Sequence, residues 1–122
     1  MKKITALFFT LIAACAVVVA CSSEEFGGLG IEVPSGSGFV TEERPYRIVS
    51  VFEGGTGHQA GLLPGDIIES IDGRELRGMQ HEHIAMKMLR GRTGSLVVLT
   101  VKRDEKVMPF RVARGKIVLR QE

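Results

Sequence analysis

Apolar and polar residues alternate in several short segments between residue 29 and the C-terminal end of the sequence. Such alternation is typical of strands with one buried face, because successive side chains point to opposite sides of a sheet. Glycine-rich clusters and the pair Asp72-Gly73 separate the segments, as turns would. The pattern predicts strands at residues 29–33, 39–40, 46–52, 67–71, 96–101 and 107–112, with residues 117–119 extending the last one.

A helical pattern occupies residues 79–90, and Gly91 follows it as a C-terminal stop. Its apolar stripe consists of Ile84, Ala85, Met88 and Leu89. Residues 58–62 predict one short helical turn. Few helices among many short strands indicate an α+β, mainly β domain: a small, partly open β-barrel capped by one main helix and one short helical turn.

The first 20 residues differ from the rest of the chain. Met1-Lys2-Lys3 forms a short positive region, and residues 4–20 carry no charge. This layout is typical of a secretory signal peptide. As a transmembrane helix the run is slightly short, since roughly 20 apolar residues are needed to cross a bilayer. The sequence therefore predicts export, with an uncleaved membrane anchor as the alternative.

The end of this run, Val18-Val19-Ala20-Cys21, resembles the lipobox of bacterial lipoproteins. In that family the cysteine thiol receives a diacylglycerol, the chain is cut before the cysteine, and the new amine is acylated. Ile12-Ala13-Ala14-Cys15 fits the same pattern, but a cut there would leave apolar residues 16–20 on the mature protein. The resemblance implies lipidation (palmitate) at Cys21, and a cleaved signal with an unmodified cysteine stays open.

Residues 21–26 then form a short polar tether that reaches only ~20 Å when fully extended. A domain over residues 27–114 would sit close to its membrane, and residues 115–122 are expected to be a C-terminal strand or tail. Ser22 after Cys21 resembles lipoproteins that are sent to the outer membrane in cells that have one. We expect a location in the cell envelope, outside the cytoplasm.

The charge balance excludes one reading and leaves another open. Removing Lys2 and Lys3 with the signal lowers the formal net charge from +2 to 0, so the basic pI of the whole chain is no sign of nucleic-acid binding. Residues 21–86 hold 4 basic and 11 acidic groups, whereas residues 87–122 hold 10 and 3. Internal complementarity is the simpler interpretation, and a basic face toward anionic lipid is the other.

An acylated Cys21 would leave no disulfide within the mature monomer, so the domain must be stable through its core.

Three stretches in this order resemble bacterial PDZ domains across about residues 27–114. Gly28-Leu29-Gly30-Ile31 is similar to the carboxylate-binding loop of that family. Residues 60–73, with Ala-Gly-Leu, Pro-Gly-Asp and Asp-Gly, are similar to its most recognisable segment. Residues 89–94, which lead into the strand at 96–101, resemble its passage from helix to strand.

The resemblance implies a groove between the loop, the following strand and the main helix, in which an extended peptide adds as a further strand. Gly28 and Gly30 leave room for backbone N–H groups to converge on a carboxylate. Leu29 and Ile31 would line the pocket for an apolar side chain, with core packing as the alternative role. On the helix the groove would be formed by His81 or Glu82, then Ala85 or Met86, and then Leu89.

The sequence departs from the family pattern at two points. Residues 22–27 contain no Lys or Arg, whereas the family often has one a few residues before the loop. The six residues after Cys21 also leave no room for a strand before the loop, so we expect the permuted bacterial form. In that form residues 107–112 or 117–119 would supply the missing strand.

The sequence offers no catalytic or metal constellation that matches a known motif. No serine lies in Gly-x-Ser-x-Gly, and the Gly54–Gly57 stretch lacks the Lys-Ser/Thr of a phosphate loop. His81 and His83 are two residues apart on a helix and diverge. Asp66 and Asp72 are expected to form turns. We therefore expect a non-catalytic, membrane-tethered adaptor without cofactor or metal, which binds C-terminal or extended peptides of envelope proteins. The alternative is a structural or regulatory subunit that docks to a larger envelope complex or protease without using the groove.

Overall fold

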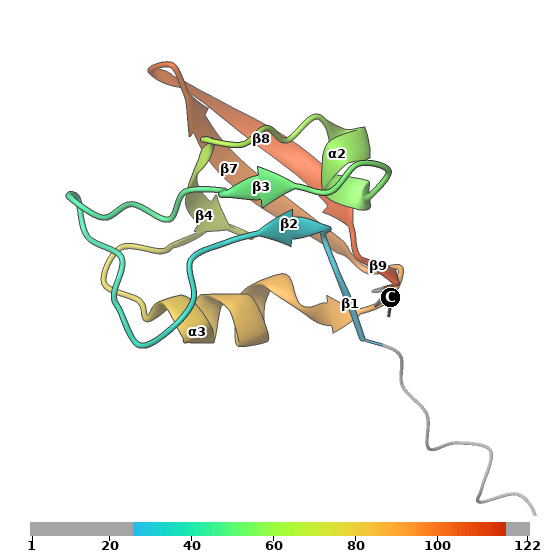
Figure 1. The fold of residues 1–122 in the computed structure, drawn as a ribbon, viewed down its shortest axis with the longest axis horizontal. Helices are drawn as coiled ribbons and strands as arrows, with labels where there is room; N and C mark the ends of the chain where they lie inside the picture. Colours follow the sequence, from blue (N-terminus) through green and yellow to red (C-terminus); the bar gives the residue numbers. More distant parts are fainter. Residues whose placement is uncertain (1–25, 117–122) are drawn as a thin grey trace, which may run out of the picture.

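The computed structural model describes residues 26–116. The apolar N-terminal run, Cys21 and the strand predicted at residues 117–119 lie outside the described residues. The described strands form three sheets, which together with one main helix surround a single core (Figure 1). The strands are β1 (Phe26–Gly28), β2 (Ile31–Glu32), β3 (Ser50–Val51), β4 (Ile67–Ile71), β5 (Arg74–Glu75), β6 (Gly91–Arg92), β7 (Leu96–Arg103), β8 (Lys106–Ala113) and β9 (Gly115–Lys116).

The largest sheet has the strand order β5-β4-β7-β8, and all of its pairs are antiparallel. The β7–β8 hairpin pairs without a break from Leu96↔Ala113 to Arg103↔Lys106. Its two-residue turn, Asp104-Glu105, has φ angles of 48° and 69°. Positive φ at both turn positions matches the twist of the flanking strands. The long strands predicted at residues 96–101 and 107–112 are confirmed, and each extends further than the pattern indicated.

The main helix begins with α3 (His81–His83) and continues as a wider turn, η3 (Ile84–Leu89). In this turn the Arg90 N–H donates to the Ala85 carbonyl, five residues back, at 3.2 Å. The short helix α2 (Thr56–Ala60) begins two residues before the predicted turn. Between residues 26 and 116, no helix is long and apolar enough to cross a membrane.

The start of the fold corrects one expectation. A strand does precede the glycine loop: β1 begins at Phe26, which the sequence pattern had assigned to the tether. It lies between β6 and β9 and pairs antiparallel with both. Residues 107–112 do not fill this place, because they form β8 and pair with β7. The C-terminal partner of β1 is instead β9, a two-residue strand too short to produce an alternating pattern.

The core lies between the large sheet, the main helix and the β2–β3 pair. Its fully buried side chains come from the large sheet, the main helix and the loops between them, and the partly buried Ile31 and Val51 of the β2–β3 pair pack against them. The fully buried side chains include Tyr46, Ile48, Leu62, Ile68, Ile71, Leu76, Ile84, Val97, Leu99, Val101 and Val112. The described fold is therefore mainly β, with one main helix and one short helix, as the sequence predicted.

One buried carboxylate connects the loop after α2 to the large sheet. Asp66 is 2% exposed and accepts two hydrogen bonds from the Arg103 guanidinium, at 2.7 and 2.8 Å. It also accepts the Leu63 N–H at 2.9 Å, while Arg103 donates to the Gly61 carbonyl at 2.9 Å. Burial alone would raise the pKa of Asp66, but the hydrogen bonds from Arg103 and Leu63 hold the pKa below its ordinary value.

We expect Asp66→Asn to lower the free energy of unfolding by about 2 kcal/mol at neutral pH, because charged hydrogen bonds are lost. The folded-state pKa of Asp66 is depressed, so this stability is complete above the unfolded pKa and is lost as pH falls toward the folded one. Urea denaturation at several pH values should show that the difference in the free energy of unfolding between the variant and the unmodified protein becomes smaller as the pH falls. Asp104→Asn, at an exposed turn position, is the control. A difference that does not change with pH would contradict a stabilising role for ionised Asp66.

Candidate functional site

The Gly28–Gly30 loop is fixed from behind by its own backbone. The Leu29 carbonyl accepts the Gly57 N–H of α2 at 2.7 Å, and the Gly30 carbonyl accepts the Phe52 N–H at 2.9 Å. Gly30 has φ +69°, and a Cβ there would lie 3.3 Å from the Gly55 Cα. Gly30 is therefore required both for its backbone conformation and for the close approach of the neighbouring loop.

Strand β2 leaves one of its edges free of other strands within the described residues. It pairs only with β3, through Ile31↔Val51 and Glu32↔Ser50. The carbonyls of Gly30 and Glu32 both bond toward β3 and its flanks. Since the N–H and C=O groups of successive residues point to alternate sides, those of Ile31 point to the other edge, toward the main helix. That edge can accept an additional extended segment.

Arg114 fixes the C-terminal end of the main helix. Its guanidinium donates to the carbonyls of Leu89 and Met88 at 2.8 Å each, and to the Ser95 hydroxyl at 3.0 Å. These carbonyls are among those left unpaired at the end of a helix, and a cation there also complements the helix dipole. Arg114 therefore positions the last helical turn opposite β2.

A groove of about 670 Å³ lies between the loop, β2 and the main helix. Its apolar wall comes from both sides, and Arg90, Lys116 and Glu53 bring charge to it. Leu29 and Leu89 are almost completely buried, whereas Phe52 is 58% exposed. The lining residues are Gly28, Leu29, Gly30, Ile31, Val33, Phe52, Glu53, Gly54, Gly55, Ala85, Leu89, Arg90, Gly115 and Lys116.

Most of the site residues expected from the sequence come together in this groove. Gly28, Leu29, Gly30 and Ile31 line one side, and Ala85 and Leu89 line the other. Of the two alternatives for the middle helical position, the structure places Ala85 in the lining. Met86 is 47% exposed and lies outside the lining.

The first helical position is organised differently from the expectation. His81 is 9% exposed, and its ring lies 5.7 Å from the ring of Tyr46, centroid to centroid. The N–H groups of His81 and Glu82 donate to the carbonyls of Gly38 and Gly36 at 2.8 and 3.2 Å. Neither residue lines the groove. The strap at residues 36–38 therefore occupies the N-terminal end of the helix.

Two basic residues of the groove were missed by the sequence interpretation. Arg90 extends from the end of the helix, and Lys116 belongs to β9. The resemblance led us to look for a basic residue only before the glycine loop, and residues 22–27 contain none. The pairing Gly27↔Lys116 brings a residue from the far end of the chain beside the loop. Only the topology could have revealed it.

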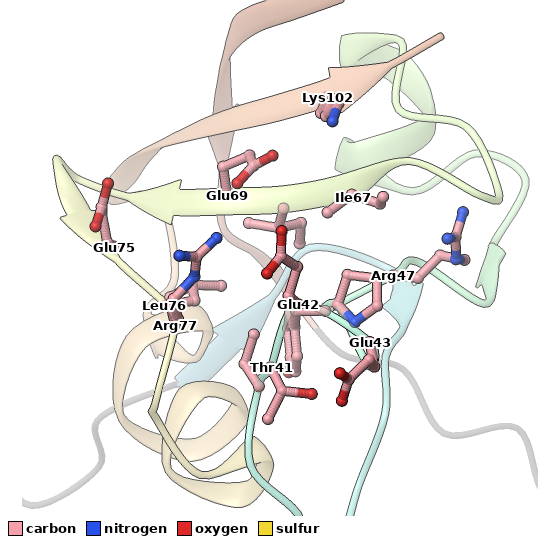
Figure 2. A pocket seen from close by; sticks show the side chains of 14 residues that line it. Thr41, Glu42, Glu43, Arg47, Ile67, Glu69, Glu75, Leu76, Arg77 and Lys102 are labelled. Atoms are coloured by element: carbon pink, nitrogen blue, oxygen red, sulfur yellow. The ribbon is translucent and has the colours of Figure 1, made fainter. Parts of the chain in front are cut away.

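A second cleft of about 440 Å³ lies between the turn at residues 41–45 and the β4–β5 edge. Figure 2 shows the side chains of Glu42 and Arg77 directed into the same space, with Glu69 above it. Carboxylates and cations alternate around this cleft, and its apolar lining is smaller than that of the groove. Charges of both signs line it, so it offers a ligand neither an apolar pocket nor a uniform charge.

Within residues 26–116, no group of His, Cys, Asp or Glu side chains is arranged to hold a metal ion. Asp72 has φ 50°, and its carboxylate accepts the Val98 N–H at 2.9 Å. Asp66 and Asp72 thus hold backbone in place. The described site has the chemistry of binding: apolar surface, an unpaired strand edge, a glycine loop and two nearby cations.

We expect Gly57→Ala to destabilise the protein by about 1–3 kcal/mol, as overpacking does. A Cβ at residue 57 would lie 2.7 Å from the Leu29 carbonyl and 2.9 Å from the Ile31 Cγ2, so the loop behind the groove must move. In an exposed helix the same change would stabilise by about 1 kcal/mol. Chemical denaturation shows whether Gly57→Ala lowers or raises the free energy of unfolding. A higher value would contradict the packing described around Gly57.

Comparison with known proteins supports this geometry. The family profile described as "PDZ domain" matches residues 47–103. A carboxy-terminal-processing protease of Bartonella bacilliformis is 35% identical over 95 residues, which cover 76% of this chain and 20% of that protein. This chain thus spans about a fifth of the length of the curated relatives it matches.

Solved structures show the same fold. The photosystem II D1 C-terminal processing protease aligns with a TM-score of 0.66 at 18% identity, covering 88% of this chain and 28% of that one. The PDZ domain of a carboxy-terminal protease from Vibrio cholerae, in complex with peptide, aligns with a TM-score of 0.57 at 22% identity and covers 78% of this chain and 99% of that one. Residues 47–103 thus match the PDZ domain family, and the fold resembles the PDZ domains of C-terminal processing proteases and HtrA-type proteases.

Proposed function

We propose that this protein is a non-catalytic adaptor of the cell envelope, anchored to its membrane by a lipid on Cys21, that binds C-terminal or extended peptide segments of envelope proteins. The observation that carries the proposal is the groove, with its apolar walls and the unpaired edge of Ile31 between β2 and the helix. A peptide would add to this edge as an extra strand.

Charge at the loop end of the groove supports recognition of a carboxylate. Arg90 and Lys116 line the groove together with Gly28 and Gly30. A terminal carboxylate near the loop would meet backbone N–H groups and the field of both cations. Leu29, Ile31 and Leu89 would then receive the last apolar side chain. The Vibrio cholerae domain was solved with a peptide, which supports a peptide ligand for the same fold here.

A binding role is also supported by the extent of the likeness. The chain matches its protease relatives over 95 residues, about a fifth of their length, and the described fold is accounted for by the PDZ-like domain. The same fact favours a second candidate. In those relatives the domain is part of a larger protease, so the second candidate is a structural or regulatory subunit that docks to a protease or envelope complex without using the groove.

We expect a library of C-terminal peptides with apolar last residues to yield binders, and Ala85→Phe to weaken them at least tenfold by filling the groove. Met86→Phe is the matched control, because residue 86 is on the same helix but exposed outside the lining. Fluorescence anisotropy measures both, and circular dichroism checks folding. A library without binders for the folded protein would refute the peptide-binding role.

The two candidates separate when partners are captured from membranes. Gly30→Val places a branched side chain at φ +69° against Gly55, so it should abolish capture of partners that use the loop. Ala85→Phe is the second variant in case Gly30→Val does not fold. Capture that is unchanged by both variants would favour a subunit that docks elsewhere.

The anchor has its own test. We expect Cys21→Ser to abolish incorporation of labelled palmitate, because the thiol that carries the diacylglycerol is gone. Cys15→Ser should leave labelling unchanged. Labelling that survives Cys21→Ser, or is lost only with Cys15→Ser, would contradict the assignment of the modified residue.

A further inference from the structure

The uneven charge of the sequence becomes a spatial separation in the fold. Residues 87–96 and 111–116 together contain six Lys or Arg residues and no Asp or Glu. The first stretch ends the main helix and forms β6, and the second ends β8 and forms β9. These elements meet around β1, at one end of the domain (Figure 1). Basic residues from two separate stretches of the sequence therefore gather at this end.

The described acidic side chains lie mostly elsewhere. Glu42, Glu43, Glu69 and Glu75 line the second cleft, and Asp104 and Glu105 form the tip of the β7–β8 hairpin. Glu53 shares the groove lining with Arg90 and Lys116 and is the acidic exception. The domain is thus polarised, with a cationic end at β1.

The cations of this end surround the point at which the chain enters the domain. Arg92 pairs with Phe26 in β1 on one side, and Lys116 pairs with Gly27 on the other. The chain that precedes Phe26 leads back through residues 21–25 to the uncharged run at residues 4–20. Basic residues therefore lie on both sides of the point of entry, and the connecting stretch before it carries Glu24 and Glu25.

An exposed apolar side chain lies within the same surface. Leu96 is 62% exposed at the start of β7. It shares the outer face of the hairpin with Arg111, because Leu96 pairs with Ala113 and the neighbouring Val98 pairs with Arg111. The Ser95 N–H donates to the Arg92 carbonyl at 3.0 Å, so a tight turn keeps Arg92 close. A single exposed leucine is ordinary on a protein surface; one that shares its face with Arg111 suits an interface between water and lipid.

We propose that this basic face, formed by Arg90, Arg92, Leu96, Arg111 and Lys116, docks on the surface of an anionic phospholipid bilayer. The proposal extends the tethered adaptor described above, since it assigns the side of the domain that faces the membrane. Basic residues near an anionic bilayer each strengthen association about fivefold, and salt screens the attraction. Leu96 would enter the headgroup region between the arginines.

The absence of tryptophan from the sequence allows a direct test in the full chain. Leu96→Trp and Val107→Trp place single probes on the same outer face of the hairpin, at opposite ends. The native side chains are 62% and 61% exposed, so the two substitutions are matched. The full chain is bound to vesicles of phosphatidylcholine with 0 or 30% phosphatidylglycerol that carry brominated acyl chains.

We expect bromine to quench the fluorescence of the Leu96→Trp variant several-fold more strongly than that of the Val107→Trp variant, only with phosphatidylglycerol, and less in high salt. In the Leu96→Trp background, Arg111→Gln should lower the phosphatidylglycerol-dependent quenching about fivefold. Lys106→Gln, at the other end of the same strand, is its matched control and should leave quenching unchanged. Equal quenching of the two tryptophan variants, or quenching of the Leu96→Trp variant that ignores phosphatidylglycerol, would overturn the proposal.

The outcome is independent of peptide recognition. Anisotropy of a bound C-terminal peptide is measured on the same protein without vesicles, so a folded domain that binds peptide but fails to dock refutes only the basic face. Docking without peptide binding would refute the groove instead. Where Arg111→Gln alters circular dichroism, Arg92→Gln replaces it, because Arg90 and Lys116 also line the peptide groove.

Discussion

The arrangement of the site depends on the close approach of three backbones at β6, β1 and β9. Glycine stands opposite glycine in both pairs, Gly27↔Gly91 and Gly28↔Gly115. A Cβ at Gly91 would lie 2.7 Å from the Arg114 side chain, and one at Gly115 would lie 2.9 Å from Thr56. A Cβ at Gly27 would meet the backbone carbonyl of Gly115, so a side chain there would separate β1 from β9. Because β1 runs directly into the loop, this contact fixes where the loop stands relative to the helix.

Arg114 connects this contact to the groove. The same guanidinium that covers Gly91 also binds the last helical carbonyls, those of Met88 and Leu89. Gly91 pairs with Gly27 of β1, and β1 leads into the Gly28–Gly30 loop. Arg114 thereby fixes the distance between the end of the helix and this loop. The Asp66–Arg103 pair acts in a comparable way at the other end of the hairpin, where it ties the loop after α2 to β7. Arg114 thus connects the β7–β8 hairpin to the main helix, and Arg103 connects it to the loop after α2.

The sequence was informative where a pattern was long or a motif was local. The β7–β8 hairpin has enough alternating residues to be predicted, and the Gly28–Ile31 and Ala60–Gly73 stretches identify the fold by their turns. Strands β1 and β9 are two or three residues long, and their pairing joins positions almost ninety residues apart, so no local signal exists. Lys116 was missed for that reason, whereas Arg90 lies at the end of the predicted helix and was not assigned to the groove. His81 was misplaced because its burial depends on the strap at residues 36–38, whose hydrogen bonds cannot be read from a glycine-rich turn.

The groove and the basic face share Arg90 and Lys116, and this sharing fixes the direction in which a ligand would run. The loop end of the groove lies beside β1, whereas the strap at residues 36–38 lies at the opposite end of the helix. A domain docked through its basic face would hold the loop next to the lipid and the strap away from it. A peptide whose carboxylate rests at the loop would then extend away from the membrane. The short tether predicted before Phe26 is compatible with this orientation, because the chain enters the domain through the same face.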